Sequence, residues 1–276
     1  MSILEAIILG LVQGAAEFLP ISSSGHLVII QALFGMTENN LAFAILLHLA
    51  TLFAIFSAYY KSVISLIKEF FLMLVDMITL KGPQLKKSKY RYYIVYIIIA
   101  TIPAGIVGVL FDDYIESAFS SVLIVAVMLL VTGFLLLLGE KIASKNIDKI
   151  ENLTPVKAGV IGLFQMCAIM PGLSRSGTTM TGGLIMGLEK EDALEFSFLL
   201  AIPTILGSVV LKIGDVIDAV KEISVLPCVA GFLTALIVGY LSILIFKRVV
   251  KKGSLISFSV YCWIVGLLLL LNIGKF

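Results

Sequence analysis

Charged residues are scarce in this chain, and their scarcity excludes most soluble proteins. Asp, Glu, Lys and Arg make up 14% of the 276 residues and hydrophobic residues make up 60%, whereas about a quarter of the residues in soluble domains are charged. Apolar runs that approach the ~20 residues needed to cross a bilayer recur along the whole chain. We therefore expect residues 1–276 to form a single integral membrane domain within a lipid bilayer. The net charge of only +2 gives no reason to expect nucleic acid as a partner.

Cysteine is almost as scarce, and its placement excludes two further classes of protein. Cys167, Cys228 and Cys262 lie in apolar segments at unrelated spacings. They form neither a disulfide framework nor a zinc-ligand pattern. The N-terminal MSILEAIILG has no basic residue and contains Glu5, so we do not expect a cleaved signal peptide.

The apolar runs predict an all-α polytopic membrane protein with six full transmembrane helices. The predicted spans are residues 41–60, 92–111, 118–139, 193–213, 224–246 and 254–272. Segment 62–80 carries charges on an otherwise apolar helix pattern, and we expect it to lie along the membrane interface.

Two further apolar regions, 3–36 and 155–187, are interrupted in the middle by Pro, Ser and Gly. Each half has only ~10–15 residues and is too short to cross the bilayer alone. This pattern favours two re-entrant helical hairpins, because irregular backbone at membrane depth must be buried in protein or line a wet cavity.

Basic residues predict the orientation of the chain. If 62–80 does not cross, 16 of the 20 Lys and Arg residues share one side of the membrane. These residues lie in the loops at 61–91, 140–157, around 190 and 247–253. Lys212, Lys221 and Lys275 lie on the other side, and Arg175 is inside the second hairpin. Because the positive side is cytoplasmic, both termini and the mouth of the first hairpin are expected to face outward.

The two interrupted regions also resemble each other, which indicates an internal duplication. GLVQ at 10–13 is echoed by GLFQ at 162–165, and each is followed by a proline and an S-x-S-G sequence. We take residues 1–140 as the first repeat and 155–276 as the second. An odd number of predicted spans separates the hairpins, so the repeats would be inverted and the hairpin tips could meet near the midplane.

The second hairpin contains PGLSRSGTTM, residues 171–180. An arginine inside the membrane is costly and therefore suggests a functional role, and its fork matches phosphate or carboxylate oxygens. The flanking Ser and Gly precede a short helix whose first backbone N–H groups also favour an anion. A purely structural role for Arg175, bridging loop carbonyls, stays open.

The first hairpin contains QGAAEFLPISSSGH, residues 13–26. Glu17 lies four residues after Gln13, on the same helix face; it could bind a metal, hold His26 in one tautomer or pair with Arg175. His26 could act as acid, base or nucleophile near neutral pH. The serines at 22–24 could be a nucleophile, phosphate donors or helix caps. His48 reads as a core histidine with satisfied hydrogen bonds, and Glu195 as a polar packing residue.

These two motifs resemble those of the bacitracin-resistance family of undecaprenyl-diphosphate phosphatases. The family's first motif, ending in S-S-x-G-H, matches residues 13–26, and its second, P-G-x-S-R-S-G-x-T, matches residues 171–179. The resemblance implies hydrolysis of undecaprenyl diphosphate, recycling of the lipid carrier for peptidoglycan synthesis, and bacitracin resistance. It also implies a location in the bacterial plasma membrane.

The resemblance also implies which residues act. The expected catalytic residues are Glu17, Ser23, His26 and Arg175. The expected substrate-binding residues are Gln13, Ser22, Ser24, Gly25, Ser174, Ser176, Gly177 and Thr179. A divalent cation, Mg²⁺ or Ca²⁺, is implied, with Glu17 as a ligand. Gln13 stands where some members have Glu, and a neutral ligand weakens a cation site.

Two other functions remain open at this point. Inverted repeats with broken segments are typical of secondary transporters, so a polyprenyl-phosphate transporter or flippase is the main alternative. An inactive lipid-binding protein is a second one. A further copy of the chain, forming a homodimer, is an additional candidate partner.

Overall fold

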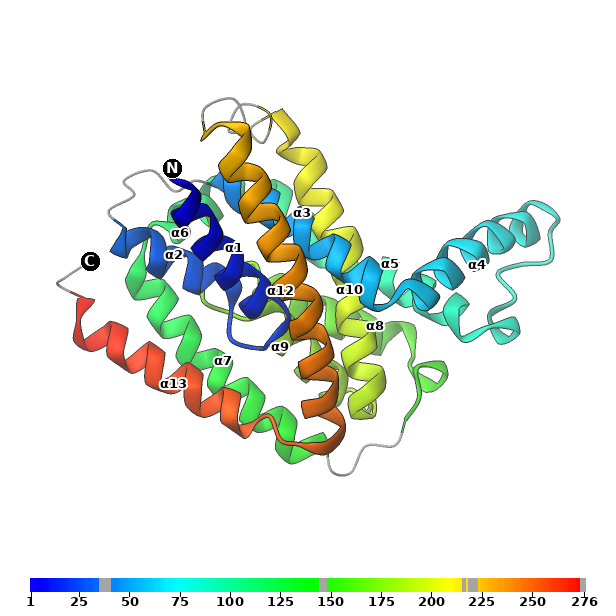
Figure 1. The fold of residues 1–276 in the computed structure, drawn as a ribbon. Coiled ribbons are helices and arrows are strands. Elements are labelled where there is room, and N and C mark those ends of the chain that lie inside the picture. The colour runs from blue at the N-terminus through cyan, green and yellow to red at the C-terminus, as the bar shows by residue number, and fades with distance from the viewer. Residues whose placement is uncertain (35–40, 144–147, 215–216, 218–222, 274–276) are drawn as a thin grey trace.

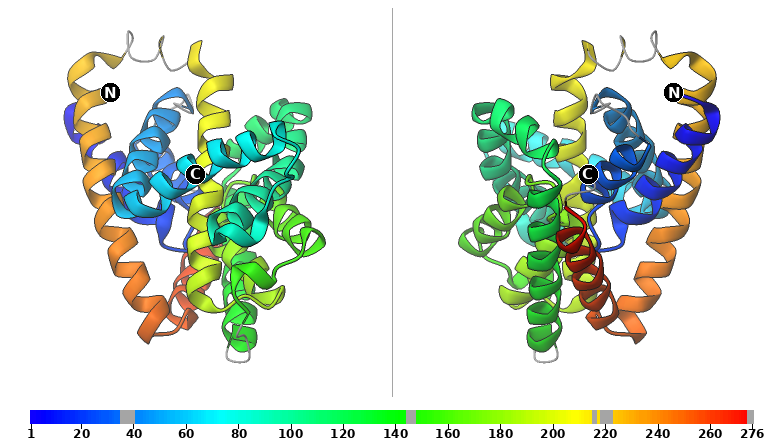
Figure 2. Two further views of the ribbon diagram at one scale, coloured as in Figure 1. Left: turned by 90° about the vertical axis from the view of Figure 1, so that its right-hand side faces the viewer. Right: turned by 90° about the vertical axis from the view of Figure 1, so that its left-hand side faces the viewer.

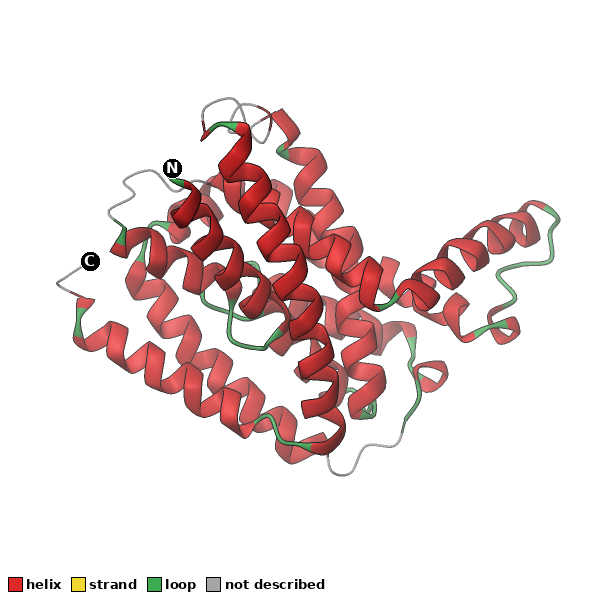
Figure 3. Ribbon diagram, viewed as in Figure 1, coloured by secondary structure: helices red, strands yellow, loops and turns green. Residues whose placement is uncertain are grey.

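The computed structural model describes residues 1–34, 41–143, 148–214, 217 and 223–273. Within these ranges the regular secondary structure is helical, as Figure 3 shows, apart from an isolated β-bridge between Asp148 and Leu188. The helices in chain order are α1 (Ile3–Phe18), α2 (Ser23–Leu33), α3 (Leu41–Ala58), α4 (Tyr60–Ile78), α5 (Lys89–Leu110), α6 (Asp112–Phe119), α7 (Val122–Ala143), α8 (Pro155–Cys167), α9 (Arg175–Ile185), α10 (Lys190–Leu211), α12 (Val225–Lys252) and α13 (Ile256–Leu271), with the 3₁₀ turns η1 (Leu85–Lys87) and η2 (Ile150–Asn152).

Four helices, α5, α7, α10 and α12, are long and apolar enough to cross a membrane (Figure 2). They coincide with four of the six predicted spans. The other two predictions, 41–60 and 254–272, are not confirmed as full spans. The first region passes the same test only together with α4, from which it is bent by 90°, and α13 has only 16 residues. The all-α, multi-pass class is therefore confirmed, whereas the number of six spans is not.

Helix α4 leaves the bundle and projects beside the start of α5 (Figure 1). The buried side chain of Arg91 fixes it there: its Nε lies 2.8 Å from Glu69 Oε2 and its NH1 lies 2.7 Å from Asp76 Oδ2. Most of the large apolar side chains of α4, such as Phe71 and Ile78, remain exposed. A helix with this exposed apolar surface outside the bundle is consistent with the predicted interfacial position of residues 62–80.

The two interrupted regions each form a pair of short helices separated by a break. α1 ends at Phe18 and α2 begins at Ser23, while α8 ends at Cys167 and α9 begins at Arg175. Both breaks contain a proline, which lacks the N–H that a continuing helix needs.

The two breaks touch at the centre of the molecule. A Cβ added to Gly25 would lie 3.0 Å from Gly172 Cα, and one added to Gly177 would lie 3.1 Å from Pro20 Cβ. Gly172 has a φ of +91°, which side-chain-bearing residues rarely adopt, so this position requires glycine. The sequence motifs of the two breaks are thereby placed against each other.

Small residues also let the outer helices of each pair pack closely against long helices. α1 lies along α12, and a Cβ added to Gly14 would lie 2.7 Å from Ala235 O. α8 lies along α5, and a Cβ added to Gly162 would lie 2.7 Å from Ala100 O. Helices in membranes commonly approach closely at small residues, and here this packing holds both breaks in place.

Candidate active site

Glu17 lies at the centre of the contact between the two breaks. It occupies the last turn of α1 and is 6% exposed. Gln13, one turn earlier, donates from Nε2 to Glu17 Oε2 at 2.9 Å. Ser23, the first residue of α2, donates its hydroxyl to the same oxygen at 2.7 Å. Arg175 NH2 binds the other oxygen, Oε1, so that one carboxylate joins both motifs.

Arg175 is the first residue of α9, and the two terminal nitrogens of its guanidinium differ in their hydrogen bonding. NH2 is engaged by Glu17, whereas NH1 is buried and has no hydrogen-bond partner in the described part of the chain. A buried donor left unpaired is costly. The free arm is therefore suited to an incoming anion with oxygen acceptors. The alternative interpretation, that Arg175 bridges loop carbonyls, is not supported by its partners.

Serines cap both short helices in the same way. Ser22 Oγ accepts from Gly25 N, and Ser174 Oγ accepts from Gly177 N, each at 3.2 Å. The expectation that capping accounts for some of these serines is confirmed. The first-turn N–H groups of α2 and α9 that the caps do not use favour negative charge, as at other helix N-termini.

The other serines and Thr179 support the turn around Arg175. Ser24 Oγ lies 3.2 Å from Ser22 Oγ and accepts from Gly172 N at 3.4 Å. Ser176 Oγ lies 3.3 Å from the capping oxygen of Ser174. Thr179 is buried and donates to the carbonyl of Arg175 at 2.8 Å. Contact of these residues with a substrate stays a prediction, because their hydroxyls bond to the protein.

His26 is not among the residues that bond to Glu17. Its Nδ1 is 2.8 Å from Ser22 O, and because a carbonyl can only accept, Nδ1 carries the proton. Nε2 therefore accepts from the hydroxyl of Tyr261 at 2.7 Å in the neutral ring, and the two rings stack with centroids 5.7 Å apart. The hypothesis that Glu17 holds His26 in its tautomer is wrong, because the Ser22 carbonyl does so.

Two residues of this cluster were missed by the sequence motifs. His48 of α3 bonds to Ala44 O through Nδ1 at 2.7 Å, as expected for a satisfied core histidine, but its Nε2 also lies 3.5 Å from Glu17 Oε2. Tyr261 of α13 is the other. An ionisable side chain inside an apolar run is a signal that could have singled out His48.

The residues around Glu17 do not fit a metal ion held by the protein alone. Within the described ranges no three His, Cys, Asp or Glu side chains gather into a group that could hold one. Both oxygens of Glu17 already accept hydrogen bonds from protein donors, one of them from the Arg175 guanidinium. That guanidinium would repel a second cation at the same carboxylate.

This arrangement defines a class of protein: a helical membrane protein whose two broken helices bring an acid, a serine and an arginine together. The chain belongs to the family of the bacitracin resistance protein BacA, whose model matches residues 6–268. It is 44% identical over 274 residues to an undecaprenyl-diphosphatase of Methanobrevibacter smithii, covering 99% of this chain and 98% of that protein. It is 43% identical over 273 residues to one of Alkaliphilus metalliredigens, covering 98% of each chain. The family resemblance seen in the two motifs is confirmed.

Proposed function

We propose that the protein is a membrane phosphatase that hydrolyses undecaprenyl diphosphate to undecaprenyl phosphate and inorganic phosphate. This reaction recycles the lipid carrier for peptidoglycan synthesis and underlies resistance to bacitracin. The observation that carries the proposal is the Glu17 carboxylate, which accepts from Ser23 and binds one arm of Arg175 while the other arm is free. The names of the relatives support the same activity.

Ser23 is the nucleophile in this proposal. Its oxygen attacks the terminal phosphorus, its proton passes to Glu17 Oε2, and the bond from that phosphorus to the bridging oxygen breaks. Undecaprenyl phosphate leaves with the bridging oxygen, which takes the proton from Glu17 and so restores its carboxylate. Water then attacks the phosphoserine and gives a proton to Glu17, which passes it to the Ser23 oxygen as inorganic phosphate leaves.

Arg175 stabilises the charge on the transferring phosphoryl group. Phosphoryl transfer relies mainly on positioning and electrostatic stabilisation, and donors aimed at developing charge contribute most in a water-poor site. The free NH1 of Arg175 and the first-turn N–H groups of α2 and α9 supply those donors. His26 is proposed to transfer a proton in the same cycle through Nε2.

Phosphate release from purified protein with a C55 diphosphate tests this function. We expect release in detergent with Mg²⁺ or Ca²⁺. We also retain the predicted need for a divalent cation, which the diphosphate oxygens would bring with them, so EDTA should suppress release and added Mg²⁺ should restore it. Undetectable release by folded protein would contradict the phosphatase; release unaffected by EDTA would contradict the cation requirement alone.

The hydrogen bond from Ser23 to Glu17 favours a phosphatase over a transporter. A transporter needs to bind the anionic headgroup, for which Arg175 and the helix N-termini suffice. It has no use for a serine hydroxyl donating at 2.7 Å to a carboxylate that can take its proton. We therefore do not propose lipid transport.

We also propose that the two halves are inverted repeats with two re-entrant hairpins, and that the site faces outward. Gly10 and Gly162 are equivalent in the sequence repeat, and each packs on a backbone carbonyl of the opposite half, Gly231 O and Ala100 O. This exchange of partners supports the duplication. The orientation follows from the basic residues, of which Lys145, Lys221 and Lys275 lie outside the described residues.

Labelling of single cysteines tests the orientation. In a Cys167→Ser background, which removes the exposed native thiol, Ser2→Cys should react with an impermeant maleimide in intact cells. Lys252→Cys at the end of α12 should react only after permeabilisation. The reverse pattern would overturn the outward-facing site.

Replacing Tyr261 with phenylalanine should lower kcat about fivefold to tenfold with little change in KM. The variant keeps the ring stacked on His26 and removes the hydroxyl that positions Nε2, a hydrogen bond worth about 1–1.4 kcal/mol. Steady-state phosphate release, with melting temperature as a folding check, measures the effect. Tyr240→Phe on α12 is the control, and an unchanged kcat for Tyr261→Phe would show that the hydroxyl does not assist His26.

A further inference from the structure

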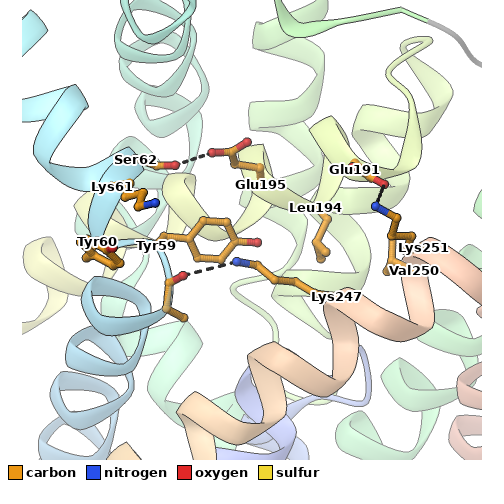
Figure 4. A pocket seen from close by; sticks show the side chains of 11 residues that line it. Tyr59, Tyr60, Lys61, Ser62, Glu191, Leu194, Glu195, Lys247, Val250 and Lys251 are labelled. Atoms are coloured by element: carbon orange, nitrogen blue, oxygen red, sulfur yellow. Dashed lines mark hydrogen bonds and ion pairs between the residues drawn. The ribbon is translucent and has the colours of Figure 1, made fainter.

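A pocket lined by polar and charged side chains, of which Glu17 is not one, lies at the bend between α3 and α4. Its cavity volume is about 410 Å³. It is lined by the residues of the bend and by side chains from the start of α10 and the end of α12, as Figure 4 shows. We propose that this pocket binds the phosphate of an anionic phospholipid headgroup.

The acidic side chains of the pocket already have partners. Glu195 accepts from the hydroxyl of Ser62 at 2.7 Å and lies 3.7 Å from Lys89 Nζ. Glu191 lies 3.6 Å from Lys251 Nζ, an ion pair marked by a dashed line in Figure 4. Each carboxylate is thus compensated by one lysine.

Two further lysines, Lys61 and Lys247, line the pocket, and Glu195 attracts the ammonium of Lys247 from beyond ion-pair distance. Neither Lys61 nor Lys247 forms an ion pair with an acidic side chain among the residues that the structure describes. Lys247 is half-buried; its Nζ lies 3.4 Å from the centroid of the Tyr59 ring and 3.4 Å from Ala58 O. These contacts fix its ammonium group at the pocket wall, and lysine binds phosphate as a point charge. The pocket is therefore suited to bind an anion.

The surroundings favour a lipid phosphate over free inorganic phosphate. Leu244 lies three residues before Lys247 on the same side of α12 and is exposed. On α4, Ile64 lies three residues after Lys61 and is also exposed. A headgroup in the pocket would therefore have its acyl chains beside apolar side chains. Basic pockets between transmembrane helices are known to hold anionic lipid headgroups.

Native mass spectrometry of the full-length protein in detergent tests the site. We titrate dioleoyl-phosphatidylglycerol, with dioleoyl-phosphatidylcholine as the zwitterionic comparison. Each lysine near an anionic lipid contributes roughly 1 kcal/mol, or about fivefold in affinity. The Lys61→Gln/Lys247→Gln variant should therefore bind phosphatidylglycerol about 25-fold more weakly, with phosphatidylcholine binding unchanged. The control Lys252→Gln, outside the pocket, should change phosphatidylglycerol binding by less than about twofold.

Two single variants check that a loss of binding is not a folding artefact. Lys247→Arg keeps the charge and should retain phosphatidylglycerol binding, whereas Lys247→Gln removes the charge and should weaken it. Phosphate release should be unaffected by all of these variants, which separates this site from the proposed catalytic one. Equal affinity for the two lipids, or full binding by the double variant, would overturn the proposal. Displacement of phosphatidylglycerol by millimolar inorganic phosphate would instead identify free phosphate as the ligand.

Discussion

Replacing Arg175 with lysine is expected to lower kcat/KM for undecaprenyl diphosphate by at least about a hundredfold, roughly 2.7 kcal/mol of transition-state stabilisation. The native guanidinium uses NH2 to bind Glu17 and leaves NH1 free. A lysine ammonium keeps the charge but cannot contact the carboxylate and a phosphoryl oxygen with two fixed, coplanar donors. Phosphate release per folded molecule measures the loss, with Arg248→Lys on the exposed end of α12 as the matched control.

The His26→Ala variant provides the partner for a double-mutant cycle. It should lose at least about as much activity, the usual scale for acid–base or nucleophilic help. Because both residues act on one transition state, the double variant should lose much less than the sum of the two losses. Strict additivity, or a stable Arg175→Lys protein with native activity, would contradict a shared site.

The Glu17→Gln variant is expected to lose activity at least about a hundredfold and also to lose stability. It removes the group that accepts the Ser23 proton and leaves the Arg175 guanidinium buried without a counter-charge. Breaking a buried ion pair on one side costs about 3–5 kcal/mol. Phosphate release and melting temperature in detergent measure the two effects, with the exposed Glu151→Gln as the control.

A second substitution separates the two roles of Glu17. The Glu17→Gln/Arg175→Gln variant removes both charges, so much of the lost melting temperature should return. Activity should stay low, because both the proton acceptor and the phosphate ligand are missing. If Glu17→Gln alone kept native activity, Glu17 could not be the base for Ser23.

Sequence pattern predicted the parts of the fold that depend on local chemistry. Long apolar runs predicted α5, α7, α10 and α12, because the bilayer requires about 20 apolar residues in each span. The 90° bend after Ala58 agrees with the predicted change from a span at 41–60 to an interfacial segment at 62–80, although no Pro or Gly marks it. The sequence pattern could not show how α4 is held beside α5, where Arg91 pairs with Glu69 and Asp76.

The candidate site also combines features that the sequence predicted with contacts that it could not. The spacing of Gln13 and Glu17 and the S-x-S-G caps are local, and the repeat suggested that Glu17 and Arg175 would meet. The contacts of Tyr261 with His26 and of His48 with Glu17 come from helices packed around the breaks. No periodicity or motif in their own segments records which helix they face, so only the three-dimensional packing reveals them.

The ion pair between Glu17 and Arg175 can form only late in the synthesis of the protein. The two residues are 158 positions apart, so at about 5–20 residues per second a ribosome needs roughly 8–30 s to supply the arginine after the glutamate. Throughout that interval the nascent chain holds a carboxyl group among apolar helices with only neighbouring polar side chains to bind it. The first half therefore remains incompletely packed until α9 arrives. The site is completed later still, because α12, which packs along α1, and α13, which carries Tyr261, follow α9 in the chain.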